Sequence, residues 1–302
     1  EGTLEKNRRI LSAIGAFKNT CLVPATMQAS PQSDAERIHL VTFTGLKDFY
    51  PGYILSRFPN ASFSAYDAGV STTMGIAANF EDGAFLETFL LWLERQKIRK
   101  DKIAFPAVLG LESAFSVSKQ IESRLERPVF EIPTLPPSMP GRRLFNAMKD
   151  HLRRQGGVIY WNWPVIGVEK SGRQVEAVTT EAQGRPNSLN ARAFILSTGS
   201  FVGGGLYAKR DRIVERVFDL PVFAPENRDD WFEQDYFSMN HGIGRAGIAV
   251  DDAFCPLESP WNNIFVCGSI LARTETLKNG CGHGFAIATG RAAARSCLER
   301  LR

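Results

Sequence analysis

Hydrophobic and polar positions alternate with two different periods along the first half of the chain. Strand-like apolar runs lie at 37–45, 61–69, 102–110 and 128–136, and helical patterns lie at 46–58, 82–98 and 112–125. Pro51 interrupts the first helical pattern early. Because strand-like and helical segments alternate along the chain, they predict an α/β layer with parallel strands over about residues 30–140.

The second half has a different pattern. A helix is predicted over 141–157, because it ends on two glycines as helices often do. Residues 158–182 alternate around a turn at Ser171/Gly172, which is the signature of a hairpin. A buried strand is predicted within 191–206. Two more strands are predicted within 246–258 and 263–270, followed by an alanine-rich terminal helix.

The composition is that of an ordinary soluble enzyme. The 302 residues carry a net charge of +4 and scattered Lys and Arg, so nucleic acid is not an expected partner. No apolar run reaches the roughly 18–20 residues that cross a bilayer, so membrane contact is expected only through a partner. The five cysteines are odd in number, lack paired spacing and follow no signal peptide, which favours a reducing cytoplasm.

One glycine motif is a decoy. The segment "HGIGRAG" (241–247) matches the dinucleotide fingerprint G-x-G-x-x-G through its glycines, but that fingerprint needs a strand before it and a helix after it. The residues that follow, "IAVDDAF", are strand-like. We therefore expect a flexible loop over a ligand or a β-bulge here.

A second glycine-rich segment, "KNGCGHGFAIATGRAAARS" (278–296), leads into the terminal helix. Cys281 and His283 have no second pair at zinc-ligand spacing, so no metal is expected. A Cys/His nucleophile is awkward on a glycine loop, and no G-x-S-x-G elbow occurs. Glycines at a helix start admit a ligand with partial negative charge, such as a flavin. The alternative is that Gly282 and Gly284 only let the helix pack tightly on a sheet.

Three stretches of the chain carry a family resemblance. They are "RPVFEIPTLPPSMPGRRLFNAMKDHLRRQGG" (127–157), "AFILSTGSFVGGGL" (193–206), and "NIFVCGSILA" (263–272) followed by "NGCGHGFAIATG" (279–290). Together they resemble the B subunit family of anaerobic glycerol-3-phosphate dehydrogenase, which is related to flavoproteins with two dinucleotide-binding domains. The resemblance extends over nearly the whole chain. "PTLPPS" with the Arg-containing helix is specific to this family, whereas the glycine loop is shared by many flavoproteins.

The resemblance implies a partial Rossmann-like α/β flavoprotein of the FAD/NAD(P)-binding type with an inserted α/β cap domain. Residues 1–29 would be the remainder of the N-terminal flavin-binding region, 30–140 the insertion and 141–302 the rest of the flavin-binding domain. The opening, helix-like and then polar and strand-like, begins without Met. Since the family's strand, G-x-G-x-x-G and helix unit has no match, we expect roughly 30 or more residues ahead of Glu1.

The resemblance also assigns site residues. The cofactor-binding residues that it implies are Ser197, Thr198, Gly199, Ser200, Gly268, Ser269, Gly280, Cys281, Gly282, His283 and Gly284. His283 is a departure, because a small residue is usual there; it would hydrogen-bond the flavin, donate a proton or cap the helix. Of the four histidines, only His241 and His283 lie in ligand-like loops, so both are candidate catalytic residues.

The implied activity is oxidation of sn-glycerol 3-phosphate to dihydroxyacetone phosphate on a flavin, with FAD favoured over FMN. Electrons would pass through iron–sulfur centres to quinone. The implied partners are a catalytic flavoprotein (the A subunit) and a membrane-associated iron–sulfur protein (the C subunit), which would place this chain at the cytoplasmic face of the inner membrane. Two alternatives stay open: a self-sufficient flavin oxidoreductase for another substrate, and an accessory scaffold without flavin.

Overall fold

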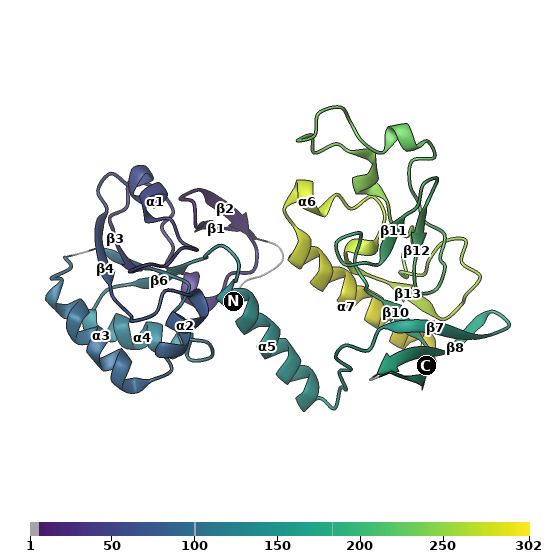
Figure 1. Cartoon of the computed structure of the whole chain (residues 1–302), viewed down its shortest axis with the longest axis horizontal. Helices are drawn as coiled ribbons and strands as arrows, with labels where there is room; N and C mark the ends of the chain where they lie inside the picture. The colour runs from purple at the N-terminus through teal and green to yellow at the C-terminus, as the bar shows by residue number, and fades with distance from the viewer. Residues whose placement is uncertain (1–5, 100, 183) are drawn as a thin grey trace. The chain divides into compact units, whose positions relative to one another are not determined.

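The computed structural model of the chain describes residues 6–99, 101–182 and 184–302, and it divides into two compact units (Figure 1). The first unit is Glu1–Ile159 and the second is Tyr160–Arg302. Each unit has a hydrophobic core of its own. The expected boundary at 140/141 lies near the start of a helix that the structure assigns to the first unit, so the division comes after that helix rather than before it.

A four-stranded parallel sheet is the centre of the first unit. Its order is β4 (Ser62–Tyr66), β3 (Ile38–Phe43), β5 (Lys102–Pro106) and β6 (Val129–Ile132). The inner strands β3 and β5 are almost wholly buried, whereas the edge strand β4 is mostly exposed. This confirms the α/β layer with parallel strands that the alternating pattern predicts.

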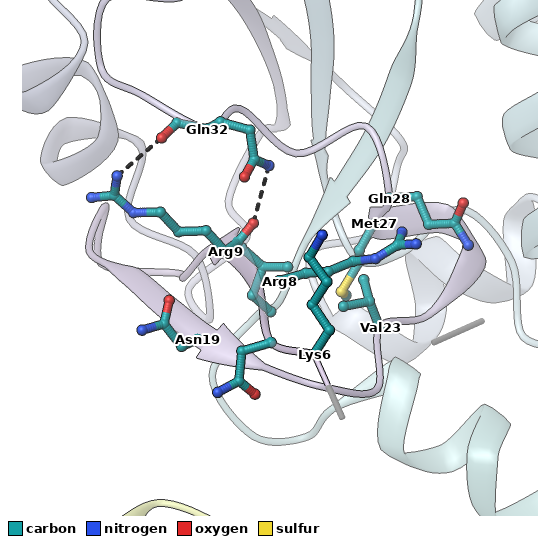
Figure 2. Close-up of a pocket in the computed structure, with 10 residues that line it drawn as sticks. Lys6, Arg8, Arg9, Asn19, Val23, Met27, Gln28 and Gln32 are labelled. Atoms are coloured by element: carbon teal, nitrogen blue, oxygen red, sulfur yellow. Dashed lines mark hydrogen bonds between the residues drawn. The ribbon is translucent and has the colours of Figure 1, made fainter. Parts of the chain in front are cut away.

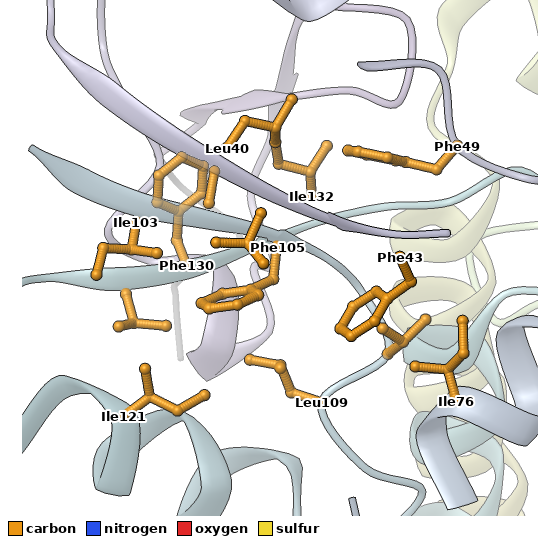
Figure 3. Close-up of a cluster of buried hydrophobic side chains, with 14 of the residues drawn as sticks. Leu40, Phe43, Phe49, Ile76, Ile103, Phe105, Leu109, Ile121, Phe130 and Ile132 are labelled. Atoms are coloured by element: carbon orange, nitrogen blue, oxygen red, sulfur yellow. The ribbon is translucent and has the colours of Figure 1, made fainter. Parts of the chain in front are cut away.

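Five helices accompany this sheet: α1 (Pro51–Arg57), α2 (Thr73–Asn79), α3 (Gly83–Arg95), α4 (Ala114–Leu125) and α5 (Met139–Arg154). Helices α2, α3 and α4 lie on one side of the sheet (Figure 1). Between them and the strands lie packed side chains, with Phe105 and Leu109 facing Ile121 of α4 (Figure 3). The prediction that Pro51 breaks the first helix is wrong. Pro51 starts α1, where its missing N–H costs no hydrogen bond.

The first described element pair of this unit is a β-hairpin, and the part of the expected helix-like opening that falls on residues 1–5 lies outside the described residues. β1 (Arg8–Leu11) pairs antiparallel with β2 (Phe17–Thr20), and a short 3-10 helix, η1 (Ala25–Met27), follows. The helix-like character expected of the opening is therefore wrong over β1. Gly15 makes the turn at φ +76°, where a Cβ would also lie 2.7 Å from the carbonyl oxygen of Tyr53.

A carboxylate occupies the N-terminus of α4. The backbone N–H groups of Leu111, Glu112 and Ser113 donate to Glu81 Oε1 at 2.5, 2.9 and 3.2 Å. In a parallel sheet this loop after β5 is where anionic ligands usually bind. Glu81 takes that place itself, so the first unit carries an internal anion where a phosphate would otherwise lie.

Glu81→Gln should therefore make stability depend on pH in a defined way. Burial raises the pKa of Glu81, but the backbone hydrogen bonds lower it more, and the net shift is downward from 4.5. A lowered carboxylate pKa stabilises the fold above the unfolded-state value, and this contribution is lost as pH falls through the folded-state pKa. In urea unfolding, wild type should exceed Glu81→Gln at neutral pH and lose that advantage below pH 4.5. Glu112→Gln on the same exposed loop is the matched control, because it removes one carboxylate and leaves the three hydrogen bonds to Glu81 in place.

The second unit is built mainly from antiparallel strands and loops. β7 (Val165–Ser171) and β8 (Gln174–Ala182) form the predicted hairpin with Gly172 at φ +56°, and β9 (Arg185–Asn190) extends it. A small parallel pair is formed by β10 (Phe194–Leu196) and β13 (Ile264–Val266). The remaining elements are β11 (Leu206–Ala208), β12 (Ile213–Glu215), η2 (Arg228–Asp230), η3 (Gly242–Arg245), η4 (Gly268–Ile270), α6 (Thr276–Asn279) and α7 (Gly282–Leu301).

Two strand predictions in this unit need correction. Residues 246–258 form only isolated bridges, because Gly247, Ile248 and Val250 each pair with a different segment. β10 is short and only partly buried, with Ile195 41% exposed, since its sheet has a single partner strand. Over the described ranges, no helix has the length and apolar character needed to cross a membrane.

Candidate functional site

The ends of β10 and β13 bring two predicted segments together. The strands are parallel and in register at Leu196 and Val266, and the N–H of Cys267 donates to the carbonyl of Leu196 at 3.0 Å. Ser197–Ser200 and Gly268–Ser269 therefore leave the same edge of the sheet. A Cβ built on Gly199 would lie 3.5 Å from Ser269 Oγ, which shows that the two turns are in contact.

The glycine run 203–205 folds back over the first of these turns. A Cβ on Gly203 would lie 2.6 Å from the carbonyl oxygen of Thr198, and one on Gly205 would lie 2.5 Å from Thr198 Oγ1. Only glycine allows this backbone approach. Thr198 Oγ1 is buried and has no hydrogen-bond partner among the described residues. An orphaned hydroxyl of this kind is typical of a site whose remaining partner is not part of the chain.

The second turn is tied to the terminal helix. Gly268 takes the left-handed conformation at φ +78°, and its N–H donates to Thr289 Oγ1 at 3.0 Å. Thr289, on α7, donates in turn to the carbonyl of Phe285 at 2.8 Å. This buried threonine joins the strand-end turn to the helix that carries the glycine loop. Sequence reasoning missed Thr289, because a threonine inside a helix gives no local signal of its own.

The start of α7 is open. Gly280 ends α6 at φ +60°, and the N-cap residue Cys281 provides no side-chain hydrogen bond to the helix. A Cβ on Gly282 would meet nothing within 4 Å. The first N–H groups of the helix therefore have no capping side chain, and this end carries the positive partial charge of the helix dipole. The tight-packing explanation does not hold for Gly282, since open space surrounds it.

The two candidate catalytic histidines differ in the hydrogen bonds that their ring nitrogens make. His241 Nδ1 accepts the N–H of Glu233 at 3.0 Å, so the proton resides on Nε2, which faces the carbonyl of Tyr236 at 3.2 Å. Both ring nitrogens thus hold a loop together. His283 is exposed at the start of α7, and among the described residues its side chain has no hydrogen bond or ion pair. Of these two histidines, only His283 has ring nitrogens without a hydrogen bond among the described residues.

The loop that His241 holds lies next to this helix start. Its residue Asn240 accepts a hydrogen bond from Lys278 Nζ of α6 at 2.7 Å. α6 is followed directly by Gly280 and α7. The loop and the glycine segment are therefore neighbours, although 38 positions separate Asn240 from Lys278 in the sequence.

The decoy motif 241–247 forms η3 and no strand–turn–helix unit. Its last glycine makes a close backbone approach, because a Cβ on Gly247 would lie 2.6 Å from the N atom of Ala272. Gly247 also pairs with Phe223 in an isolated bridge. The third glycine thus packs one loop against the segment after η4, and the dinucleotide fingerprint is absent at this position.

Gly247→Ala should destabilise the second unit by about 1–3 kcal/mol, because the added methyl group must push two backbone segments apart. Gly244→Ala, in the preceding helix η3, is the matched control, since a Cβ there meets nothing within 4 Å. Urea unfolding monitored by tryptophan fluorescence would compare the two variants. Equal stability of both would show that the close contact with Ala272 is not made in solution.

Two of the five cysteines lie in surroundings that disfavour metal binding. Burial raises the pKa of the Cys267 thiol, and it also raises that of Cys255. A raised thiol pKa disfavours the thiolate that binds metals. Among the described residues, no three His, Cys, Asp or Glu side chains lie together in a way that would hold an ion.

Paired strand ends, close glycine turns and an uncapped helix start define an α/β flavoprotein of the Rossmann-like type. Residues 65–285 match the family described as the FAD binding domain, and the chain belongs to this family. The flavin expected from the sequence is therefore FAD.

Curated relatives agree with the resemblance described above. A Halobacterium salinarum protein, named as the B subunit of a probable anaerobic glycerol-3-phosphate dehydrogenase, is 27% identical over 95% of this chain and 73% of its own length. The B subunit of the Aliivibrio fischeri enzyme is 26% identical over 98% of this chain and 72% of its own. The B subunit of the Pectobacterium atrosepticum enzyme is 31% identical over 66% of this chain and 47% of its own length. No solved structure matches the chain.

The residues at this site fit a flavin. The orphaned Thr198 hydroxyl offers a hydrogen-bond group, and the open N-terminus of α7 offers N–H donors and a positive field to the electron-rich edge of the ring. When bound, FAD supplies a two-electron acceptor for dehydrogenation.

Proposed function

We propose that the chain is the FAD-dependent B subunit of an anaerobic sn-glycerol-3-phosphate:quinone oxidoreductase. In this role it oxidises glycerol 3-phosphate to dihydroxyacetone phosphate and relays electrons to iron–sulfur centres. The names of the relatives support the substrate, and membership of the FAD-binding domain family supports the redox chemistry. The observation that carries the proposal is the uncapped start of α7, which is anchored through Thr289 to the turn after β13.

The roles of the chain's own residues follow from this arrangement. Ser197–Ser200, Gly268–Ser269 and Gly280–Gly284 hold the cofactor, mainly through backbone groups. Oxidation of a secondary alcohol also needs an acceptor for the hydroxyl proton. His283 provides the free imidazole for that step, whereas His241 would first have to give up a hydrogen bond within its loop.

The shortage of free bases favours a second candidate function. His39 is buried on β3 and hydrogen-bonded to Ser62 and Ser64, at 2.7 and 2.9 Å. His241 is bound to its own loop as well. Among the described residues of the proposed cofactor site, His283 is therefore the one histidine whose ring nitrogens make no hydrogen bond. A chain that only relays electrons, while the catalytic A subunit oxidises the substrate, needs no base at all.

The partners in this proposal are the A subunit and the membrane-associated iron–sulfur C subunit. The word "subunit" in the names of the relatives supports a complex of several chains. Contact with the cytoplasmic face of the inner membrane would be made through these partners.

Anaerobic reduction by sn-glycerol 3-phosphate tests the proposal. The protein should purify with FAD, and its visible absorption should bleach when substrate is added. Bleaching by the chain alone would support substrate oxidation in this chain, and bleaching that requires the A subunit would support the relay role. A protein that binds no flavin would leave the scaffold alternative, and flavin that only another substrate reduces would contradict the assigned activity.

A further inference from the structure

The first unit contains a cationic cavity that the proposed function does not use. It has a volume of about 390 Å³ and lies between the β1–β2 hairpin and the η1 segment (Figure 2). The residues that line it are Lys6, Asn7, Arg8, Arg9, Ile10, Asn19, Val23, Met27, Gln28 and Gln32. Three are cations and none of these described lining residues is acidic.

The alternation of the strand explains how the cavity is built. Arg8 and Ile10 project to one side of β1, since side chains in a strand point to alternate faces. Lys6, two residues before the strand, lines the same cavity. Ile10 packs on the buried pair Val23 and Met27, which form an apolar floor. Lys6 and Arg8 continue the same row beyond Ile10, and Figure 2 shows both extending towards Met27.

The third cation, Arg9, forms contacts within the chain. The Arg9 guanidinium donates to the carbonyl of Gln32 at 3.0 Å and lies 4.0 Å from the centre of the Phe17 ring. The Gln32 amide donates back to the carbonyl of Arg9 at 3.3 Å. These contacts fix the hairpin against the segment that follows η1. Arg9 therefore holds the wall of the cavity and leaves the anion-binding charge to its neighbours.

Lys6 and Arg8 stand without a counter-charge. Among the described residues, neither side chain takes part in a hydrogen bond or an ion pair. Among the described residues, Glu36 contacts the cavity wall by accepting the N–H of Gln32, but Lys102 already neutralises it at 2.6 Å. Two like charges that line one cavity repel each other, and an anion between them removes this cost.

We infer that this cavity is a binding site for a phosphate monoester with a small carbon skeleton. A guanidinium binds two oxygens of a phosphate in a fork, and an ammonium adds a point charge to a third. A dianion balances Lys6 and Arg8 together. The side-chain amide of Asn19 lies at the rim for polar contact, and the apolar floor suits the carbon part. The volume is at the lower end of the range for small-molecule sites.

Calorimetric titration of the whole chain at low ionic strength tests the site. Inorganic phosphate and sn-glycerol 3-phosphate should both bind, and uncharged glycerol should not. Arg8→Gln should weaken phosphate binding by about tenfold or more, since a charge-assisted hydrogen bond is lost. Arg95→Gln is the matched control: it removes the same charge from an exposed position at the end of α3, and it should bind as wild type does.

Absence of phosphate binding by wild type, or equal weakening in both variants, would overturn the inference. Because the readout is binding and not turnover, its failure is distinct from a failure of the proposed function. Circular dichroism should show that Arg8→Gln is folded, as expected for an exposed side chain.

Sedimentation of the protein with vesicles, with and without phosphatidic acid, identifies the source of the phosphate. Co-sedimentation with phosphatidic acid vesicles that is lost in Arg8→Gln alone indicates a lipid headgroup. No co-sedimentation of the wild type indicates a free metabolite. Sedimentation lost equally in both variants would indicate general surface charge and contradict the site.

Discussion

Arg143→Ala should lower the free energy of unfolding of the first unit by about 3–5 kcal/mol. Arg143 Nη1 lies 2.6 Å from Glu131 Oε2, and the carboxylate of Glu131 is fully buried. Removal of the arginine leaves a buried negative charge without its ion-pair partner, which costs far more than the loss of an exposed ion pair. Urea unfolding of the whole chain, followed by far-UV circular dichroism, would measure the change.

The size of the effect follows from the number of groups that meet at this pair. Glu131 also accepts the hydroxyl of Thr26 at 2.6 Å and the N–H of Leu109 at 2.9 Å. Arg143 donates further to the carbonyl of Gly110 through Nε and Nη2, at 2.9 and 2.6 Å. The pair therefore joins η1, β6, the loop after β5 and α5. Its loss should loosen all four elements together.

Arg142→Ala is the matched control, since Arg142 is the neighbouring exposed arginine on the same helix. It should change the stability by no more than about 0.5 kcal/mol. Addition of Glu131→Gln to Arg143→Ala should restore part of the loss, because it removes the unpaired charge. A loss in Arg143→Ala no larger than in Arg142→Ala would mean that Glu131 is solvated or paired elsewhere.

The segments with a clear period were the most predictable from the sequence. The strands of the parallel sheet and the hairpin turn at Gly172 follow from local alternation, because burial on one face imposes that pattern directly. The arginine-containing helix after "PTLPPS" was also visible in the sequence, although Arg143 itself was not singled out. Its partner Glu131 was not visible either, because a glutamate within an apolar run does not reveal which distant cation it meets.

The failures lie where tertiary contacts replace regular pairing. Residues 246–258 have the composition of a strand, but each paired residue there bridges to a different segment. The opening of the chain has a helix-like composition, yet the glycine turn at Gly15 and pairing with β2 make residues 8–20 a hairpin. Pro51 resembles a helix breaker in the sequence, whereas its position in α1 makes it a helix start.

The candidate site also contains residues that the sequence predicts and residues that it does not. Its glycine turns and strand ends were predictable, because glycine and small residues at strand ends are local signals. Thr289 was not, since its part in the site depends on a hydrogen bond to Gly268 across 21 positions. The engagement of both nitrogens of His241 was equally invisible, because the folded loop determines it. The assignment of all these residues to the cofactor stays a prediction.

Gly282→Asp should reduce FAD content and lower the midpoint potential of any flavin that remains. The open N-terminus of α7 would place its positive end at the electron-rich part of the ring, and a carboxylate there adds like-charge repulsion to the reduced flavin. The field of a helix terminus contributes about 0.3–1 kcal/mol at exposed sites and up to about 2 kcal/mol when partly buried. FAD content by absorbance and midpoint potential by redox titration would measure the effect.

The surroundings of Gly282 make this test sharp. Since a Cβ there meets no atom of the chain within 4 Å, Gly282→Ala should keep or increase stability while it loses FAD through contact with the ligand. Asp in the first turn should likewise favour the helix, so neither loss would come from unfolding. His283→Ala should retain the cofactor, because the backbone and not the imidazole holds it. Full FAD occupancy with an unaltered potential in Gly282→Asp would mean that the start of α7 does not face the flavin, and the glycines would then need an explanation outside cofactor binding.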